Sequence, residues 1–258
     1  MVDAWNLTIL DAVPATVETA NGWGQTELLL TSQPGERASM PAGADACVLD
    51  LGASVSVRQI ALLYTTLEEG DTIRLTASDN ADGITGAVLD SGVMELDEVA
   101  LARPSGYRHF FYHRVAGSKK ARYVRVASNV AATRYAGRLM AGDPWQPENN
   151  AIFGETSWGY EEADQDEVLD SGVSVLYEMD PAPIFQFTLD WITEEELNDR
   201  ADLLSRRQWE GVPVMVMRRP DPHTNLHNAL YYGLLKMAPV VAVDFDTFSV
   251  SCSVRSML

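Results

Sequence analysis

Hydrophobic and polar residues alternate most clearly in the last third of the chain. Over 184–191, apolar side chains occupy every second position: Phe185, Phe187, Leu189 and Trp191. This period of two turns one face of a strand towards a core, where all four are expected. Thr193 then stands three residues before Glu196, the spacing of a capping box that begins a helix. Gly211 is expected to end that helix, and 212–217 to form the next strand.

The same alternation predicts short strands elsewhere. In the first half they are expected at 5–9, 28–31, 47–51, 59–65, 72–78, 108–115 and 122–127, with a strand pair inside 88–96. No amphipathic helix is predicted between 46 and 142, and strands at this spacing are typical of a β-sandwich. In the second half, strands are expected at 151–156, 173–179, 184–191, 212–217, 229–236, 240–244 and 248–254.

A polar stretch with two prolines, 142–150, is the best candidate for a linker. We therefore predict two domains, a β-sandwich over 1–145 and an α+β domain over 146–258. The second domain is expected to hold an antiparallel sheet and one main helix. The fold class is mainly β.

The chain of 258 residues has a formal net charge of -18 and a pI of about 4.5. Such an acidic surface repels phosphate backbones, so nucleic acid is not an expected partner. No apolar run is long enough to span a bilayer, and Met1 leads into a polar segment, so we expect synthesis in the cytoplasm and no membrane insertion. Cys47 and Cys252 form no disulfide framework and are expected to be buried thiols.

The histidines fall into two pairs with a spacing of four, His109 with His113 and His223 with His227. On a helix this spacing offers two ligands to one metal ion. The first pair lies in a predicted strand, where four residues span about 13 Å, and the second lies in a predicted loop. Turn residues and solvated imidazoles are therefore the favoured interpretation, and we predict no metal site.

Two acidic stretches leave alternatives open. The turn at 79–83 contains Asp79, Asn80 and Asp82 and suits either a calcium ion or a plain hairpin turn. The run over 161–167 suits a solvated loop or a contact with a basic partner. The sequence contains no nucleophile elbow, phosphate-binding loop or dinucleotide fingerprint. We expect no enzyme activity and no cofactor.

The run 47–128 resembles the galactose-binding-like jelly roll of the discoidin (coagulation factor 5/8 type C) group. The resemblance is carried by 48–52, 57–64, 73–80 and the late strand Ala121-Arg122-Tyr123-Val124-Arg125-Val126. It implies a jelly-roll sandwich that binds carbohydrate or protein through loops at one rim.

The part from about 150 to 258 resembles a minor or distal tail protein of tailed bacteriophages. The order of 185–191, the capped helix, 212–222 and 231–235 carries this resemblance. It implies a virion structural protein of a tail tip or baseplate. In distal tail proteins the carbohydrate-binding-like domain usually follows the ring-forming domain, whereas here the jelly roll comes first.

Polar-tipped aromatic residues in or near loops are the candidates for binding: Trp23, Tyr107, Tyr112 and Tyr135. We expect a homo-oligomer, a trimer or hexamer, that contacts other tail proteins within the virion. The jelly roll is expected to touch host-surface glycan or neighbouring subunits. The alternatives are a carbohydrate-binding module attached to a small glycan-hydrolysing domain, and a lectin without an assembly role.

Overall fold

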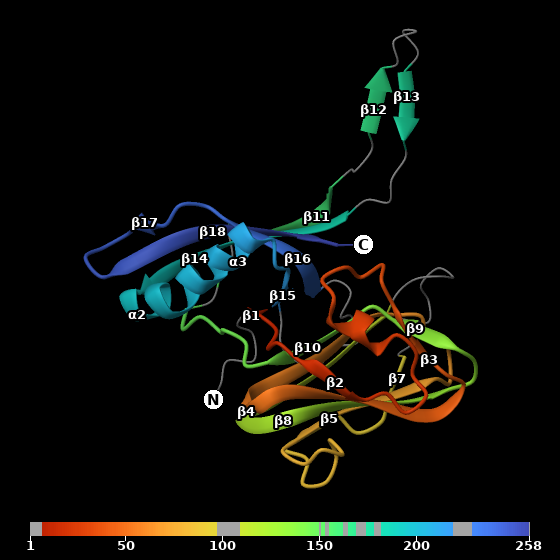
Figure 1. Ribbon diagram of the computed structural model, residues 1–258. Coiled ribbons are helices and arrows are strands. Elements are labelled where there is room, and N and C mark those ends of the chain that lie inside the picture. Colours follow the sequence, from red (N-terminus) through yellow and green to blue (C-terminus); the bar gives the residue numbers. More distant parts are fainter. Residues whose placement is uncertain are drawn as a thin grey trace. The chain divides into compact units, whose positions relative to one another are not determined.

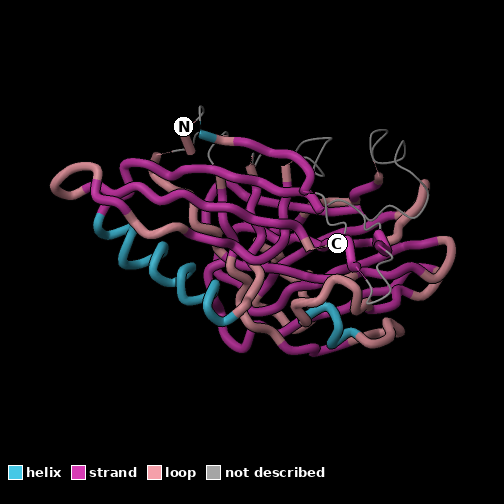
Figure 2. Tube along the Cα trace, turned by 90° about the horizontal axis from the view of Figure 1, so that it is seen from above, coloured by secondary structure: helices cyan, strands magenta, loops and turns pink. Residues whose placement is uncertain are grey.

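A computed structural model describes residues 7–96, 109–149, 151–152, 155–161, 165–168, 174–177, 182–218 and 229–257. These residues are mainly in antiparallel β-strands, which confirms the predicted fold class (Figure 2). The chain divides into two compact units. Unit 1 comprises 1–146 and 217–230, and unit 2 comprises 147–216 and 231–258. The predicted boundary between 145 and 146 stays a prediction.

Unit 1 is built around two long neighbouring strands, β4 (Gly43–Thr65) and β8 (His109–Val130) (Figure 1). The sheet has the order β10-β4-β8-β5-β6, with β2 paired to β4 and β7 paired to β5. The other strands of this sheet are β2 (Thr16–Thr19), β5 (Thr72–Ser78), β6 (Leu89–Asp90), β7 (Met94–Glu95) and β10 (Arg138–Gly142). A separate pair joins β3 (Ala38–Met40) to β9 (Arg134–Ala136), and β1 (Thr8–Leu10) forms a bridge from Ile9 to Trp145.

The core of unit 1 lies against the inward face of this sheet. Its members come from β4, β5 and β8, from the facing segments and from a short 3-10 helix, among them Trp23, Leu29, Met40, Cys47, Leu49, Ile73, Leu75, Val124 and Val126. Bulges divide the β4–β8 ladder between Asp50 and Val55 and again between Val57 and Gln59. Because bulges bend a strand and shift its alternation, different faces of β4 and β8 point towards the core at different positions along each strand.

Several predicted elements of unit 1 need correction. The separate strands at 47–51 and 59–65 are both parts of β4, and those at 108–115 and 122–127 are both parts of β8. The strand predicted at 28–31 is a 3-10 helix, η1 (Thr26–Leu30). The two short strands around 90–92 exist, but each pairs with β5 instead of with the other. Pairing with a long neighbour gives them hydrogen bonds that a two-residue hairpin could not supply.

Unit 2 contains a sheet in the order β15-β16-β18-β14-β11, with β17 paired to β18. Its strands are β11 (Ser157–Glu161), β14 (Ala182–Thr193), β15 (Val214–Met217), β16 (Leu230–Met237), β17 (Val241–Ala242) and β18 (Thr247–Ser256). Strands β12 (Gln165–Val168) and β13 (Ser174–Tyr177) form a separate pair. Of the strand predicted at 151–156, residues 153–154 lie outside the described residues, and 151, 152, 155 and 156 are in no strand. The Ile152 N–H donates to the Thr188 carbonyl of β14 at 3.0 Å, but the ladder between β11 and β14 begins at Ser157.

The predicted helix is present and begins as expected. The Thr193 hydroxyl accepts from the Glu196 N–H at 3.3 Å, and the Glu196 carboxylate accepts from the Thr193 N–H. The helix runs through α2 (Glu194–Glu196), a π-helical turn η3 (Leu197–Ala201) and α3 (Asp202–Glu210). Gly211 ends it at φ 67°, a left-handed conformation that favours glycine. No helix in the described residues is long and apolar enough to cross a membrane.

One core prediction fails in β14. Phe185, Phe187 and Leu189 are buried as expected, but Trp191 is 52% exposed. The register between β14 and β18 shifts between Leu189 and Ile192, and Trp191 has a φ of 59°. The extra residue of a bulge reverses the alternation of faces, so Ile192 takes the buried position and the Trp191 ring turns to solvent.

Candidate binding site

A shallow trough crosses the outward face of the unit 1 sheet, and its floor is made of small side chains. Ala46 on β4 lies opposite Ala127 on β8, and Ala127 lies opposite Arg74 on β5. In the next outward row, Ala44 and Thr72 flank Asn129. Directly opposite residues share a face of a sheet. The alanines leave a hollow of about 500 Å³, a size that suits a small ligand.

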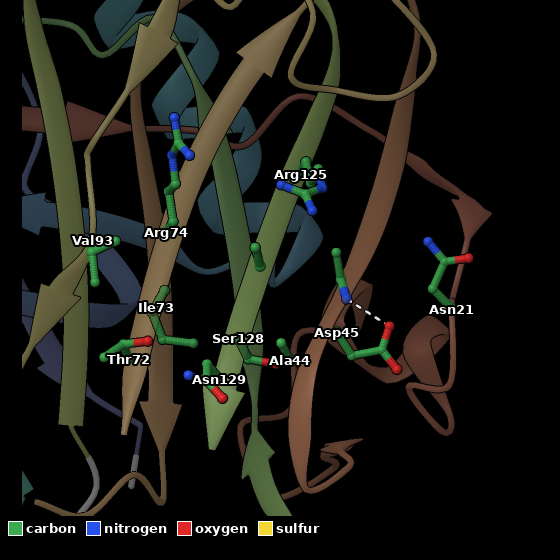
Figure 3. Close-up of a pocket in the computed structure, with 12 residues that line it drawn as sticks. Asn21, Ala44, Asp45, Thr72, Ile73, Arg74, Val93, Arg125, Ser128 and Asn129 are labelled. Atoms are coloured by element: carbon green, nitrogen blue, oxygen red, sulfur yellow. Dashed lines mark hydrogen bonds between the residues drawn. The ribbon is translucent and has the colours of Figure 1, made fainter. Parts of the chain in front are cut away.

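Polar residues and two apolar residues, Ile73 and Val93, surround this floor (Figure 3). Val93 borders the trough beside β5, and Asn21 borders it on the opposite flank, beyond β4. Asp45 accepts from the Ala46 N–H at 2.8 Å through one oxygen, which fixes its carboxylate near that flank. The trough therefore offers donors and acceptors from different strands around one open surface.

Arg74 is held in place by a carboxylate. Its Nε and a terminal nitrogen donate to the two Asp90 oxygens at 2.8 and 2.5 Å. This hydrogen bonding lowers the pKa of Asp90 to about 2 and raises the pKa of Arg74. A bidentate pair of this kind fixes the orientation of the guanidinium plane. Arg74 thus contributes a rigid wall whose charge is already balanced.

Arg125 is the cation of the trough whose charge is not balanced in this way. It lies on β8 opposite Val48 and Thr76 and is half-buried. Its guanidinium has no hydrogen bond or ion pair within the described part of the chain, and its charge attracts the Asp82 carboxylate. Gly83 packs against its stem, since a Cβ at Gly83 would lie 2.6 Å from the Arg125 Cβ. A glycine at this place, with a φ of 68°, lets the turn close over the arginine.

A second polar atom near the trough lacks a partner. Ser128 lines the trough and is 3% exposed, and its hydroxyl has no hydrogen-bond partner within the described residues. Buried hydroxyl groups in proteins are usually satisfied, and an exception calls for an explanation. Ser128 lies opposite Ile73 and two positions after Val126, both of which are core residues, so its hydroxyl is on the inward face and does not face the trough.

A buried carboxylate holds the same end of the trough together. Asp71 accepts from the Glu68 N–H at 2.9 Å, from the Ala131 N–H at 2.9 Å and from Arg134 Nε at 2.7 Å. Burial lowers the pKa of Arg134, but hydrogen bonds to Glu68 and Asp71 outweigh it and raise that pKa. The network ties the turn before β5 to the turn after β8, next to Thr72 and Asn129.

Three of the four predicted binding residues are described, and none of the three lines the trough. Trp23 belongs to the core, and Tyr112 is buried with its hydroxyl 3.2 Å from Gln59 Oε1. Tyr135 is 43% exposed. Tyr107 lies outside the described residues. A role of these residues in binding stays a prediction, with Tyr135 the one described member that offers an exposed ring.

The histidines and acidic residues that were weighed as metal ligands are described in part. His109 is buried and His113 half-buried on β8, where burial lowers the pKa of His113 despite the nearby Asp90 charge. The pair His223 and His227 lies outside the described residues. The Asp82 carboxylate accepts from the Ile84 and Thr85 N–H groups and from the Thr85 hydroxyl. Within the described residues no group of three or more His, Cys, Asp or Glu side chains gathers as a metal site would require.

The trough was missed because its members are single residues spread over the first half of the chain. Between Ala44 and Asn129 there is no motif, and only the pairing of strands brings them together. A signal was nevertheless present. In the predicted strand 72–78, Arg74 and Thr76 alternate with the apolar Ile73 and Leu75, which indicates a polar outer face.

No protein-family model matches the sequence, and no match was found among the curated proteins. Among solved structures, the chain is similar to the CBM32 of AlyQ in complex with 4,5-unsaturated mannuronic acid. The identity is 14%, the match covers 52% of this chain and 96% of that chain, and the TM-score is 0.37. It is also similar to CBM32-1 from a family 31 glycoside hydrolase from Clostridium perfringens, with 11% identity, coverage of 50% and 94%, and a TM-score of 0.37.

A third similar structure is the Streptococcus pneumoniae fucose binding module SpX-3. It has 9% identity, the match covers 52% of this chain and 98% of that chain, and the TM-score is 0.36. All three similarities extend over about half of this chain. The function therefore has to be inferred from the residues of the chain itself.

Proposed function

We propose that this chain is a carbohydrate-binding protein and that unit 1 holds a glycan in the trough. The observation that carries the proposal is the open alanine floor with fixed polar walls and one guanidinium, that of Arg125, which no ion pair holds within the described residues. A sugar ring carries hydroxyl groups in several directions, so its site needs both donors and acceptors. Arg74, Arg125 and Asn129 supply donors, and Asp45 supplies an acceptor.

The mixture of charges separates this ligand class from others. Arg125 and Asp45 carry opposite charges, and Arg74 is neutralised by Asp90. A site for nucleic acid would need a continuous basic surface, whereas this chain has a formal net charge of -18. A neutral glycan, or one with a single acidic group against Arg125, is the ligand that this balance accepts.

A glycan array probed with the full chain tests the proposal. Each hit is then measured by isothermal titration calorimetry with the wild type, Arg125→Met and the control Arg206→Met. Arg206 is an exposed helical arginine that pairs with Asp202 in unit 2. Arg125→Met should bind each hit about 10-fold more weakly than the wild type, or weaker still, because it loses a hydrogen bond from a charged donor.

Two results would overturn this assignment. One is an array without any bound glycan, and the other is a glycan that binds Arg125→Met as tightly as the wild type. Tyr135→Ala separates the trough from the exposed Tyr135 ring on β9. If this variant loses binding and Arg125→Met keeps it, the ligand binds at Tyr135 and not in the trough.

A second proposal keeps the role expected from the sequence resemblance, a structural protein of a phage tail. Its support is the set of large apolar side chains that unit 2 exposes, which are residue types enriched at protein contacts: Trp158, Tyr160, Trp191, Trp209 and Phe245. Electron microscopy of particles labelled at this protein is the test. Absence of label from the tails would exclude the role.

Attachment to a small hydrolytic domain stays a prediction, tested by release of reducing sugar from a bound glycan.

A further inference from the structure

Strand β11 forms an edge of the unit 2 sheet that carries two aromatic rings. All five of its residues are exposed, with Trp158 at 59% and Tyr160 at 64%. On its inner side β11 pairs with β14, and in the described part of the chain it has no strand on its outer side. An edge of this kind presents N–H and C=O groups to a further strand.

The aromatic surface of β11 continues the apolar face of the sheet. Trp158 lies directly opposite Phe185 on β14, and Phe185 stacks on Tyr231 with ring centroids 5.0 Å apart. Phe185 and Tyr231 are buried, but Trp158 at the end of this row is not. Edge strands that must stay single usually carry a lysine, a proline or a bulge. The sequence Ser157-Trp158-Gly159-Tyr160-Glu161 has no lysine or proline, and its pairing with β14 is regular.

We propose that this edge pairs with the same edge of a second copy of the chain. In an antiparallel pair centred on Gly159, Trp158 lies opposite the second copy's Tyr160, and Tyr160 lies opposite its Trp158. Ser157 then lies opposite Glu161. This register places all four aromatic rings in two cross-strand pairs, which are among the favourable pairs of antiparallel sheets. The other registers separate the rings or bring the two copies of Glu161 together.

The charges at β11 agree with a second copy as the partner. A net charge of -18 works against self-association in general. At this edge, however, the only charged residue of the strand is Glu161, whose carboxylate lies 3.2 Å from Arg255 Nε of its own chain. The proposed register also faces Glu161 with a neutral serine. The edge is therefore a local surface where two acidic chains meet without opposing carboxylates.

Single cysteines in the full chain test the register. Gly159→Cys is expected to give a disulfide-linked dimer under mild oxidation, because residues at the centre have Cα atoms about 4.5–5.5 Å apart. A Cβ at this position meets no atom within 4 Å. The matched controls Ser157→Cys and Glu161→Cys should not cross-link alone, since like residues lie about 13 Å apart. A mixture of these two variants should cross-link. Both native thiols are buried.

Sedimentation velocity provides the second measurement. The wild type at about 100 µM should sediment at twice the chain mass of 28.3 kDa, because a small strand interface gives about micromolar affinity. Trp158→Thr with Tyr160→Thr should be a monomer with unchanged far-UV circular dichroism, whereas Trp209→Thr, at an 88% exposed site on α3, should remain a dimer. A monomeric wild type would overturn the proposal. Efficient cross-linking of Ser157→Cys alone would overturn it as well.

Discussion

Replacement of Asp71 by alanine provides a strong test of the unit 1 structure. The Asp71 side chain is fully buried, and its two oxygens accept from two backbone N–H groups and from Arg134. The exposed pair of Arg74 with Asp90 is the natural comparison, because it joins the same residue types in the same unit. The Asp90 side chain is 38% exposed.

The magnitude follows from what each substitution leaves behind. Asp71→Ala removes an acceptor from three donors, and an unsatisfied buried donor costs about 1–3 kcal/mol. Breaking a buried ion pair by removal of one partner typically costs about 3–5 kcal/mol. Because Arg134 keeps its second partner, Glu68, at 2.6 Å, we expect a loss near the lower end, about 3 kcal/mol. Asp90→Ala removes a solvent-screened pair, and its effect should be much smaller.

Hydrogen exchange of β8 amides at increasing urea concentration measures the stability of unit 1 separately from unit 2. Asp71→Ala should lower the free energy of opening of β8 by far more than Asp90→Ala. It should also weaken glycan binding, since Asp71 precedes Thr72 and bonds to the turn that follows Asn129. Equal effects of the two substitutions on β8 would refute the reasoning from burial.

Three further predictions concern single groups. The pKa of Asp90, about 2 in the folded chain, lies below its unfolded value of about 3.9, so its contribution is fully present above pH 4 and is lost as the pH falls towards 2. The difference in urea midpoint between wild type and Asp90→Asn should therefore shrink as the pH falls from 4 to 2 and vanish below pH 2. Burial raises the pKa of both Cys47 and Cys252 to about 12; a thiol reagent at pH 8 should react with them only as fast as the chain unfolds. Gly83→Ala should lower stability by about 1–2 kcal/mol because of its left-handed φ, and glycan affinity should fall with it because the new methyl group displaces Arg125, as calorimetry would reveal.

The sequence was most informative where local signals determine structure. The alternation in β5 predicted its bounds, Thr72–Ser78, and the capping box predicted the start of the helix at Thr193. Such signals involve residues within one turn or a few strand positions of each other. They need no knowledge of which strands become neighbours.

The errors arose where pairing partners decide the outcome. Two separate strands were predicted at 47–51 and 59–65, but they form the single strand β4. The ladder with β8 is interrupted between Asp50 and Val55 and then continues. Trp191 follows the alternation of Phe185, Phe187 and Leu189 in the sequence, yet a bulge against β18 turns it outward. A bulge is an extra residue in one strand relative to its partner, so it cannot be recognised from the pattern of one strand alone.

The trough combines both kinds of information. Alternation with Ile73 and Leu75 places Arg74 on an outward position, but only the register puts Ala127 opposite Ala46 and so creates the hollow. A shift of one residue in β8 would move Asn129 and Arg125 into the core and bring Val126 to the outer face. Burying two polar side chains in this way is costly. The hydrogen bonds of Asp71 with the Ala131 N–H and with Arg134 also oppose a shift of β8. The residues that fix the register of the sheet are therefore the same ones that position the proposed binding groups.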